Sequence, residues 1–154
     1  MAQALWALNL VWQAVAAGFA FSYAVTLGAF FQWQVRARDD EFFTRVYTPF
    51  RTTLRLKWRY RLFMPFGPAL TAAASLAFNH SAHAALPQVL AVVVFFLYYF
   101  LAHVPTGFAK AEEDLMSGKG LTERQRRIYL RFNIPLHILM GSLYAATAVA
   151  LALT

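Results

Sequence analysis

His137 lies in a row of polar, small and aromatic residues that helical spacing places on one face. Asn133 precedes it by four residues, Gly141 follows it by four and Tyr144 by seven. Residues at these spacings are neighbours on an α-helix. A neutral imidazole serves as a general base, and a neighbouring amide can orient the ring or a substrate. We therefore predict His137 and Asn133 as catalytic residues, with Gly141 and Tyr144 lining the substrate.

His103 is the second candidate for chemistry. It follows Tyr99 by four residues and Tyr98 by five, and both tyrosines are predicted to line the same site. Two neutral imidazoles can ligate haem or a non-haem metal, which makes His103 and His137 candidate cofactor ligands of unknown metal preference. Two other interpretations stay open. The histidines can bind a ligand or catalyse without a metal, or they can be unrelated residues held by hydrogen bonds.

The distribution of charge defines the elements that must position these residues. Only 14% of the residues are charged and 60% are hydrophobic, whereas a soluble domain carries about 25% charged residues. A charge at mid-membrane costs at least about 2.5–3.5 kcal/mol, and a spanning helix needs about 20 apolar residues. The sequence predicts one all-α domain, an integral membrane four-helix bundle. Its spans are expected at about 5–31, 62–78, 86–104 and 132–153.

The basic residues predict the orientation of the bundle. All fourteen Lys and Arg residues lie in segments 36–61 and 110–131. Neither terminus contains a basic residue, and neither does the 79–85 connection. Because basic loops stay in the cytoplasm, both termini are predicted to be non-cytoplasmic. His103 and His137 then share the cytoplasmic leaflet. A bacterial inner membrane is the expected location.

The two basic segments also predict the partners. Segment 41–61 interleaves aromatic and basic residues, a pattern typical of an interfacial segment that contacts anionic lipids at the cytoplasmic face. An anionic ligand, another membrane protein or a second copy of the chain remain alternatives. A net charge of +7 favours nucleic acid in a soluble protein. Here the charges border apolar spans, so we expect no nucleic-acid partner.

Small residues at four-residue spacing predict a contact between helices in the first span. Ala14, Gly18, Ser22 and Thr26 form this row, and such rows let membrane helices approach closely. The acidic run 112–114 is expected either to pair with the first basic segment or to form a solvated face.

Three stretches resemble the anthrone-oxygenase-like family of small four-helix membrane proteins. The sequence GFAFSYAV at 18–25 resembles the family's glycine-then-aromatic opening. HVP at 103–105 and RFNIPLH at 131–137 resemble the ends of its third span and the start of its fourth. The order and spacing of the spans also agree. The resemblance implies an oxygenase-type or uncharacterised membrane protein with Asn133 and His137 at its polar site.

Two functions are consistent with these sequence features. The first is a small membrane enzyme, oxygenase-like, that acts on an apolar aromatic or quinone-like substrate in the cytoplasmic leaflet. The second is a non-catalytic subunit or assembly factor of a larger membrane complex. A proton-coupled transporter is disfavoured, because no predicted span contains Asp, Glu, Lys or Arg.

Overall fold

The structure is a computed structural model that describes all residues 1–154. It is helical throughout and contains no strand, which confirms the predicted all-α class. The α-helices are α1 (Ala2–Val25), α2 (Leu27–Ala37), α3 (Thr48–Thr53), α4 (Leu56–Arg61), α5 (Gly67–Asn79), α6 (Ala85–Tyr98), α7 (Phe108–Met116) and α8 (Glu123–Ala152). Three π-helical segments join them, η1 (Phe42–Tyr47), η2 (Leu62–Phe66) and η3 (Tyr99–His103).

Four helical stretches are long and apolar enough to cross a membrane. They run over Ala2–Ala37, Leu56–Asn79, Ala85–His103 and Glu123–Ala152. Three of them extend further toward the basic segments than the sequence predicts, by six to nine residues. The reason is that charged residues continue a helix once it leaves the apolar region, so an uncharged window underestimates its length. The first stretch also breaks at Thr26, where non-helical backbone separates α1 from α2.

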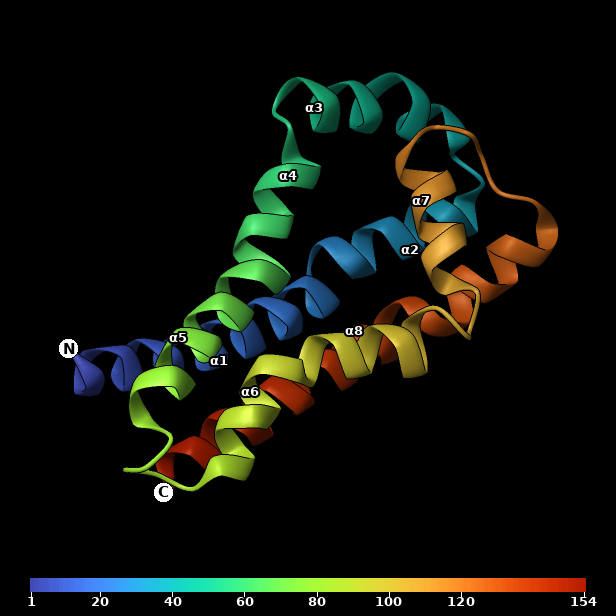
Figure 1. Cartoon of the computed structure of the whole chain (residues 1–154). Coiled ribbons are helices and arrows are strands. Elements are labelled where there is room, and N and C mark those ends of the chain that lie inside the picture. The colour runs from blue at the N-terminus through green and yellow to red at the C-terminus, as the bar shows by residue number, and fades with distance from the viewer.

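The four long stretches form a closed bundle (Figure 1). α1 packs against both α5 and α8. α6 also contacts α5 and α8, so each long helix has two neighbours and the ring of four is closed. α1 makes its contacts through buried alanines, Ala16, Ala17, Ala20 and Ala24. The predicted row of Ala14, Gly18, Ser22 and Thr26 instead faces outward and is exposed. The two rows lie on different faces, and spacing alone does not distinguish them.

Both termini lie at the same end of the bundle (Figure 1). The Asn79 amide donates to the carbonyl of Ala2 at 3.0 Å, and the Nδ1 of His83 lies 3.0 Å from the carbonyl oxygen of Thr154. The α5–α6 connection, which carries no Lys or Arg, therefore lies beside both chain ends. The basic segments lie at the opposite end with α3 and α7.

Short helices cover the basic end of the bundle. Gly107 adopts a positive φ of 76° and turns the chain from η3 into α7. α7 then buries Phe108, Ala111 and Leu115 completely, because residues at i, i+3 and i+7 share its inner face. This face packs on α8 and η1. α7 is thereby fixed over the ends of the long helices.

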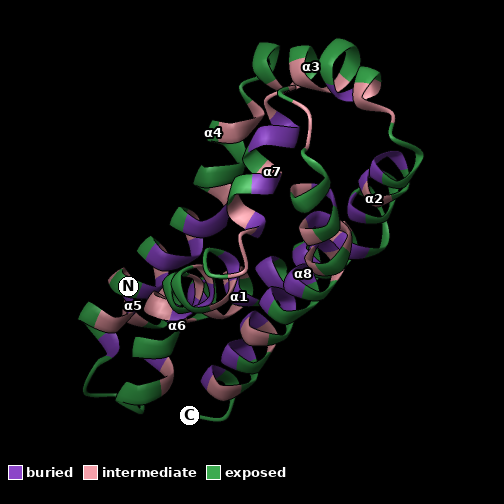
Figure 2. Cartoon of the chain, turned by 90° about the vertical axis from the view of Figure 1, so that its right-hand side faces the viewer, coloured by how far each residue is buried: buried purple, intermediate pink, exposed green.

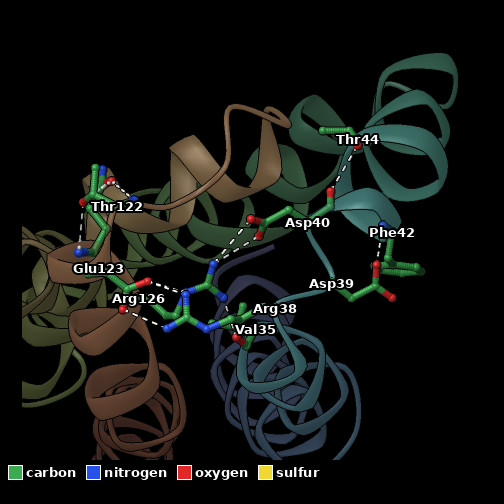
Figure 3. Close-up of polar contacts among 10 residues, drawn as sticks. Val35, Arg38, Asp39, Asp40, Phe42, Thr44, Thr122, Glu123 and Arg126 are labelled. Atoms are coloured by element: carbon green, nitrogen blue, oxygen red, sulfur yellow. Dashed lines mark hydrogen bonds and ion pairs between the residues drawn. The ribbon is translucent and has the colours of Figure 1, made fainter.

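A buried arginine joins α8 to the end of α2 (Figure 3). The Arg126 guanidinium donates to the carbonyl of Val35 and lies 3.4 Å from both carboxylate oxygens of Asp40. Beside it, Arg38 pairs with Glu123 at 2.6 Å. These contacts tie the second half of the first helical stretch to the start of the last one.

The exposed surface of the bundle is rich in large apolar side chains, among them Leu8, Val11, Leu70, Leu97 and Val149. Figure 2 places exposed residues along the outer faces of the long helices and buried residues along their inner faces. Several buried residues are polar, including Asn9, Gln13, Asn79 and Gln88. An apolar exterior around a partly polar interior is the arrangement that lipid favours.

Candidate functional site

A π-helical turn places His103 beside Tyr98. Residues five apart on an α-helix lie about 140° around the axis from each other, too far to share a face. In η3 the backbone bonds run from i to i+5, which widens the turn. The Tyr98 hydroxyl and His103 Nδ1 are consequently 3.0 Å apart. Tyr99 stacks on the same imidazole, with ring centroids 5.3 Å apart. The structure thus brings both predicted tyrosines to His103.

Glu112 approaches the other nitrogen of this imidazole. Its Oε2 lies 3.5 Å from His103 Nε2, and its side chain is 29% exposed. Burial raises the pKa of Glu112, but the hydrogen bond from His103 and the positive fields of His137, His103 and Arg51 outweigh this and lower the pKa below its ordinary value. Glu112 is therefore a carboxylate at neutral pH. Tyr98, His103 and Glu112 form a chain of polar contacts from the bundle interior to the basic end.

His137 has one ring nitrogen engaged and one available. Its Nδ1 lies 2.7 Å from the backbone oxygen of Asn133, and a carbonyl can only accept. Nδ1 therefore carries the proton in the neutral ring, and Nε2 keeps its lone pair. The Asn133 amide donates to the carbonyl of Gly28 at 2.8 Å, which fixes α8 to α2 at this point. The available Nε2 has the chemistry of a general base.

Phe108 brings the two histidines into one cluster. Its ring packs edge-to-face against His103 and His137, with centroid distances of 5.1 and 6.1 Å. Tyr129 stacks on the same phenylalanine at 5.3 Å, and Tyr23 packs on His137 at 4.1 Å. The expectation that both imidazoles lie near one another is therefore supported by the geometry, with Phe108 of α7 as their shared neighbour.

Several buried polar atoms near His137 have no hydrogen-bond partner. They are the hydroxyls of Tyr23 and Tyr129 and Oδ1 of Asn133. No hydrogen bond that meets the usual distance and angle limits is formed by either hydroxyl. A buried polar atom without a partner costs about 1–3 kcal/mol. Such a group of atoms is therefore suited to a ligand that brings its own oxygen atoms.

The remaining predicted residues lie in the same bundle with different surroundings. Tyr144 is fully buried in the main core. Gly141 faces α1, where a β-carbon would meet the Phe21 ring at 3.0 Å. The absent side chain of Gly141 thus leaves room for the Phe21 ring of α1. The space beside it is filled by Phe21, so Gly141 is not free to line a substrate.

The residues present do not fit a haem or a metal ion. No three His, Asp or Glu side chains come together as a metal site. Both nitrogens of His103 already have partners, Tyr98 and Glu112. Phe108, which is completely buried, contacts both imidazoles where a shared cofactor would have to lie. We therefore derive no chemistry through a cofactor.

Four residues of this cluster were absent from the sequence-based prediction: Tyr23, Phe108, Glu112 and Tyr129. A sequence signal could have found one of them. Tyr129 precedes Asn133 by four residues, so it continues the row that contains His137. For Tyr23, Phe108 and Glu112, only the packing of α1 and α7 against α8 reveals the contact.

No family model, curated protein or solved structure matches this chain.

Proposed function

We propose that this chain is an integral protein of a bacterial inner membrane, with its basic end in the cytoplasm and both termini outside. Four apolar helical stretches and the confinement of Lys and Arg to one end of the bundle support this orientation. The site around His137 then lies in the cytoplasmic leaflet, where an apolar substrate can reach it from the lipid.

We further propose that the protein is an oxygenase-like enzyme acting on an apolar aromatic or quinone-like substrate. The observation that carries this proposal is the group of unpaired buried oxygens of Tyr23, Tyr129 and Asn133 in the side-chain cluster that also contains the available Nε2 of His137. Two hydroxyl donors can hold an oxygen that becomes negatively charged, and an imidazole can remove the proton.

The proposed reaction uses dioxygen as the second substrate and converts a CH₂ group to a ketone and water. His137 Nε2 removes a proton from an acidic CH₂ group beside a phenolic ring, and the Tyr23 and Tyr129 hydroxyls stabilise the resulting enolate oxygen. The carbanion reacts with O₂ to give a hydroperoxide, which loses water to leave a ketone. The carbon is oxidised by four electrons, one oxygen atom enters the product and the other leaves in water. The carboxylate of Glu112 stabilises the protonated His137 through its charge.

Oxygen consumption by the purified protein tests this function. With an anthrone-type substrate, which carries the acidic CH₂ group, in mild detergent, we expect uptake of O₂ above the uncatalysed rate. The variant His137→Gln should lose about a hundredfold or more, the usual contribution of a general base. His80→Ala, at an exposed position in the α5–α6 connection, is the matched control and should keep full activity. Wild-type protein that consumes no O₂ with any such substrate, or a fully active His137→Gln variant, contradicts the proposal.

The exposed row on α1 supports a second candidate, a subunit that packs on another membrane helix. Nothing lies within 4 Å of a β-carbon built on Gly18, and the row that contains it faces outward. Small residues at four-residue spacing are a common contact between membrane helices. Under this candidate, Gly18→Ile abolishes co-purification of a partner or a second copy, while Leu70→Ile on the exposed face of α5 does not. Equal association of both variants contradicts it.

A further inference from the structure

The corner between α3 and α4 has an unusual backbone for its sequence. Arg55 adopts a positive φ of 51°, the left-handed region that favours glycine or asparagine. Its carbonyl accepts from the backbone N–H groups of Trp58 and Arg59 and so starts α4, the first part of the second apolar stretch. The chain therefore holds an arginine where glycine, which has no β-carbon, would be easier to accommodate.

This corner contains a hollow lined by cations. Its volume is about 230 Å³, and Arg51, Thr52, Arg55, Lys57 and Trp58 line it. The three cations, a hydroxyl and an indole N–H are all hydrogen-bond donors. A group of donors around one hollow is suited to an anion with several oxygens, such as a phosphate.

The charges of this hollow are only partly neutralised within the chain. Glu113 lies 3.6 Å from Arg51 and 2.8 Å from Lys57, and Arg51 also donates to the carbonyl of Met116. These contacts hold two of the cations in place. Arg55 has no hydrogen-bond or ion-pair partner for its guanidinium. Three cations facing one carboxylate leave a net positive charge. Arg55 is the cation of this group whose charge is not paired.

Exposed apolar side chains lie on the same short segment of the chain, and one of them, Trp58, lines the hollow. Phe50, Trp58 and Leu62 are 51%, 61% and 66% exposed. The guanidinium of Arg61 lies over the Trp58 ring at 5.5 Å, which keeps another cation at the same level. Large apolar residues beside phosphate-binding cations are unfavourable for a site that takes a soluble anion from water. They suit the headgroup level of a bilayer, where the acyl chains cover them.

We propose that the α3–α4 corner binds the phosphate of an anionic phospholipid through Arg51, Arg55 and Lys57, with Trp58 against the glycerol and acyl region. The inference rests on the proposed membrane insertion with the basic end in the cytoplasmic leaflet, and it is independent of the proposed oxygenase activity. The bound lipid supplies the missing partner of Arg55. It also fixes the start of the second helical stretch to the membrane surface.

Native mass spectrometry of the full chain in mild detergent tests the site. The protein is titrated with phosphatidylglycerol, with phosphatidylcholine and with inorganic phosphate. We expect one tightly retained phosphatidylglycerol and roughly tenfold or more weaker retention in Arg55→Gln, because a charge-assisted contact is lost. Arg124→Gln is the matched control, since it removes the same charge from an exposed position at the same end of the bundle. It should retain the lipid within twofold.

Each alternative result overturns the proposal. Equal weakening in Arg55→Gln and Arg124→Gln means diffuse attraction rather than a site. Equal retention of phosphatidylcholine means that the cations are not used. Displacement of the lipid by millimolar inorganic phosphate, with the phosphate retained in its place, identifies a soluble anion as the ligand.

Thermal unfolding in lipid-free detergent is the folding control. The curve of Arg55→Gln is expected to match the wild type, which shows that lost binding is not lost folding.

Discussion

At the scale of single residues, the site depends on which atoms already have partners. The backbone oxygen of Asn133 fixes the tautomer of His137, and its side-chain amide holds the carbonyl of Gly28. One residue therefore leaves Nε2 of the imidazole available and anchors the helix that faces it. His103 differs, because Tyr98 and Glu112 engage both of its nitrogens. This difference is the reason why the proposed mechanism assigns the base to His137 and an electrostatic role to His103 and Glu112.

Glu112 provides a prediction on pH. Its folded-state pKa lies below the ordinary value of 4.5, so its contribution to stability is present above that value and is lost as the pH falls through the folded pKa. Glu112→Gln should lower the free energy of unfolding by about 1 kcal/mol at pH 7, the usual size for one such contact. Thermal unfolding in detergent from pH 7 to pH 3 measures the gap between the two proteins, which should close at the acidic end.

The control for this experiment is Glu41→Gln. Glu41 pairs with Arg45 at the surface, where its side chain is 67% exposed. Exposed pairs contribute little, so this variant should follow the wild-type curve at every pH. A gap for Glu112→Gln that stays constant from pH 7 to pH 3 would show that the carboxylate charge does not stabilise the fold.

At the scale of elements, α8 is the helix whose N-terminus has a side-chain cap. Thr122 caps α8 in a reciprocal arrangement, in which its hydroxyl accepts from the Gln125 backbone and Gln125 Oε1 accepts from the Thr122 backbone. Thr122→Ala should cost about 1 kcal/mol of stability. Thr122→Ser keeps the cap and should cost much less. Denaturant titration of both variants measures the difference, and equal losses would indicate that the methyl group matters rather than the cap.

The junction of α2 and α8 gives a prediction for an arginine. The Arg126 side chain is only 8% exposed and is held by Val35 and Asp40 (Figure 3). Arg126→Gln removes charge-assisted bonds from a buried position and should cost about 2 kcal/mol. Arg124→Gln, two residues earlier and exposed, should change stability by less than about 0.5 kcal/mol. The same denaturant titration compares them, and comparable losses would mean that burial of Arg126 has no energetic role.

The sequence predicts these elements unevenly, for physical reasons. Charge-free windows locate the four long stretches, because lipid penalises every charge within a span. The windows miss the helix ends, where charged residues continue the same hydrogen bonding. The π-turn that aligns Tyr98 with His103 has no signal in the pattern, since it depends on how η3 packs. Spacing within α8 correctly groups Asn133 with His137, whereas Phe108 and Glu112 join them only through the long-range fold of α7.

At the scale of the whole molecule, the two ends of the bundle differ in charge. One end contains every Lys and Arg, the Arg126 junction and the proposed lipid site, and the other contains both termini and an uncharged connection. The proposed enzyme needs this separation, because it places the His137 site in one leaflet. Orientation is therefore the property on which the other proposals depend, and it is directly measurable.

The absence of cysteine makes this measurement clean, since each introduced thiol is the only one in the chain. Gln3→Cys and Ser81→Cys are exposed at the end with the termini, and Thr53→Cys is exposed at the basic end. In intact bacterial spheroplasts, a membrane-impermeant maleimide should label the first two and leave Thr53→Cys unlabelled until the membrane is opened. Labelling of Thr53→Cys alone would mean the inverted orientation and place the His137 site in the outer leaflet. Immediate labelling of all three would contradict a spanning bundle altogether, because a thiol at each end can be reached from one side only if no membrane separates them.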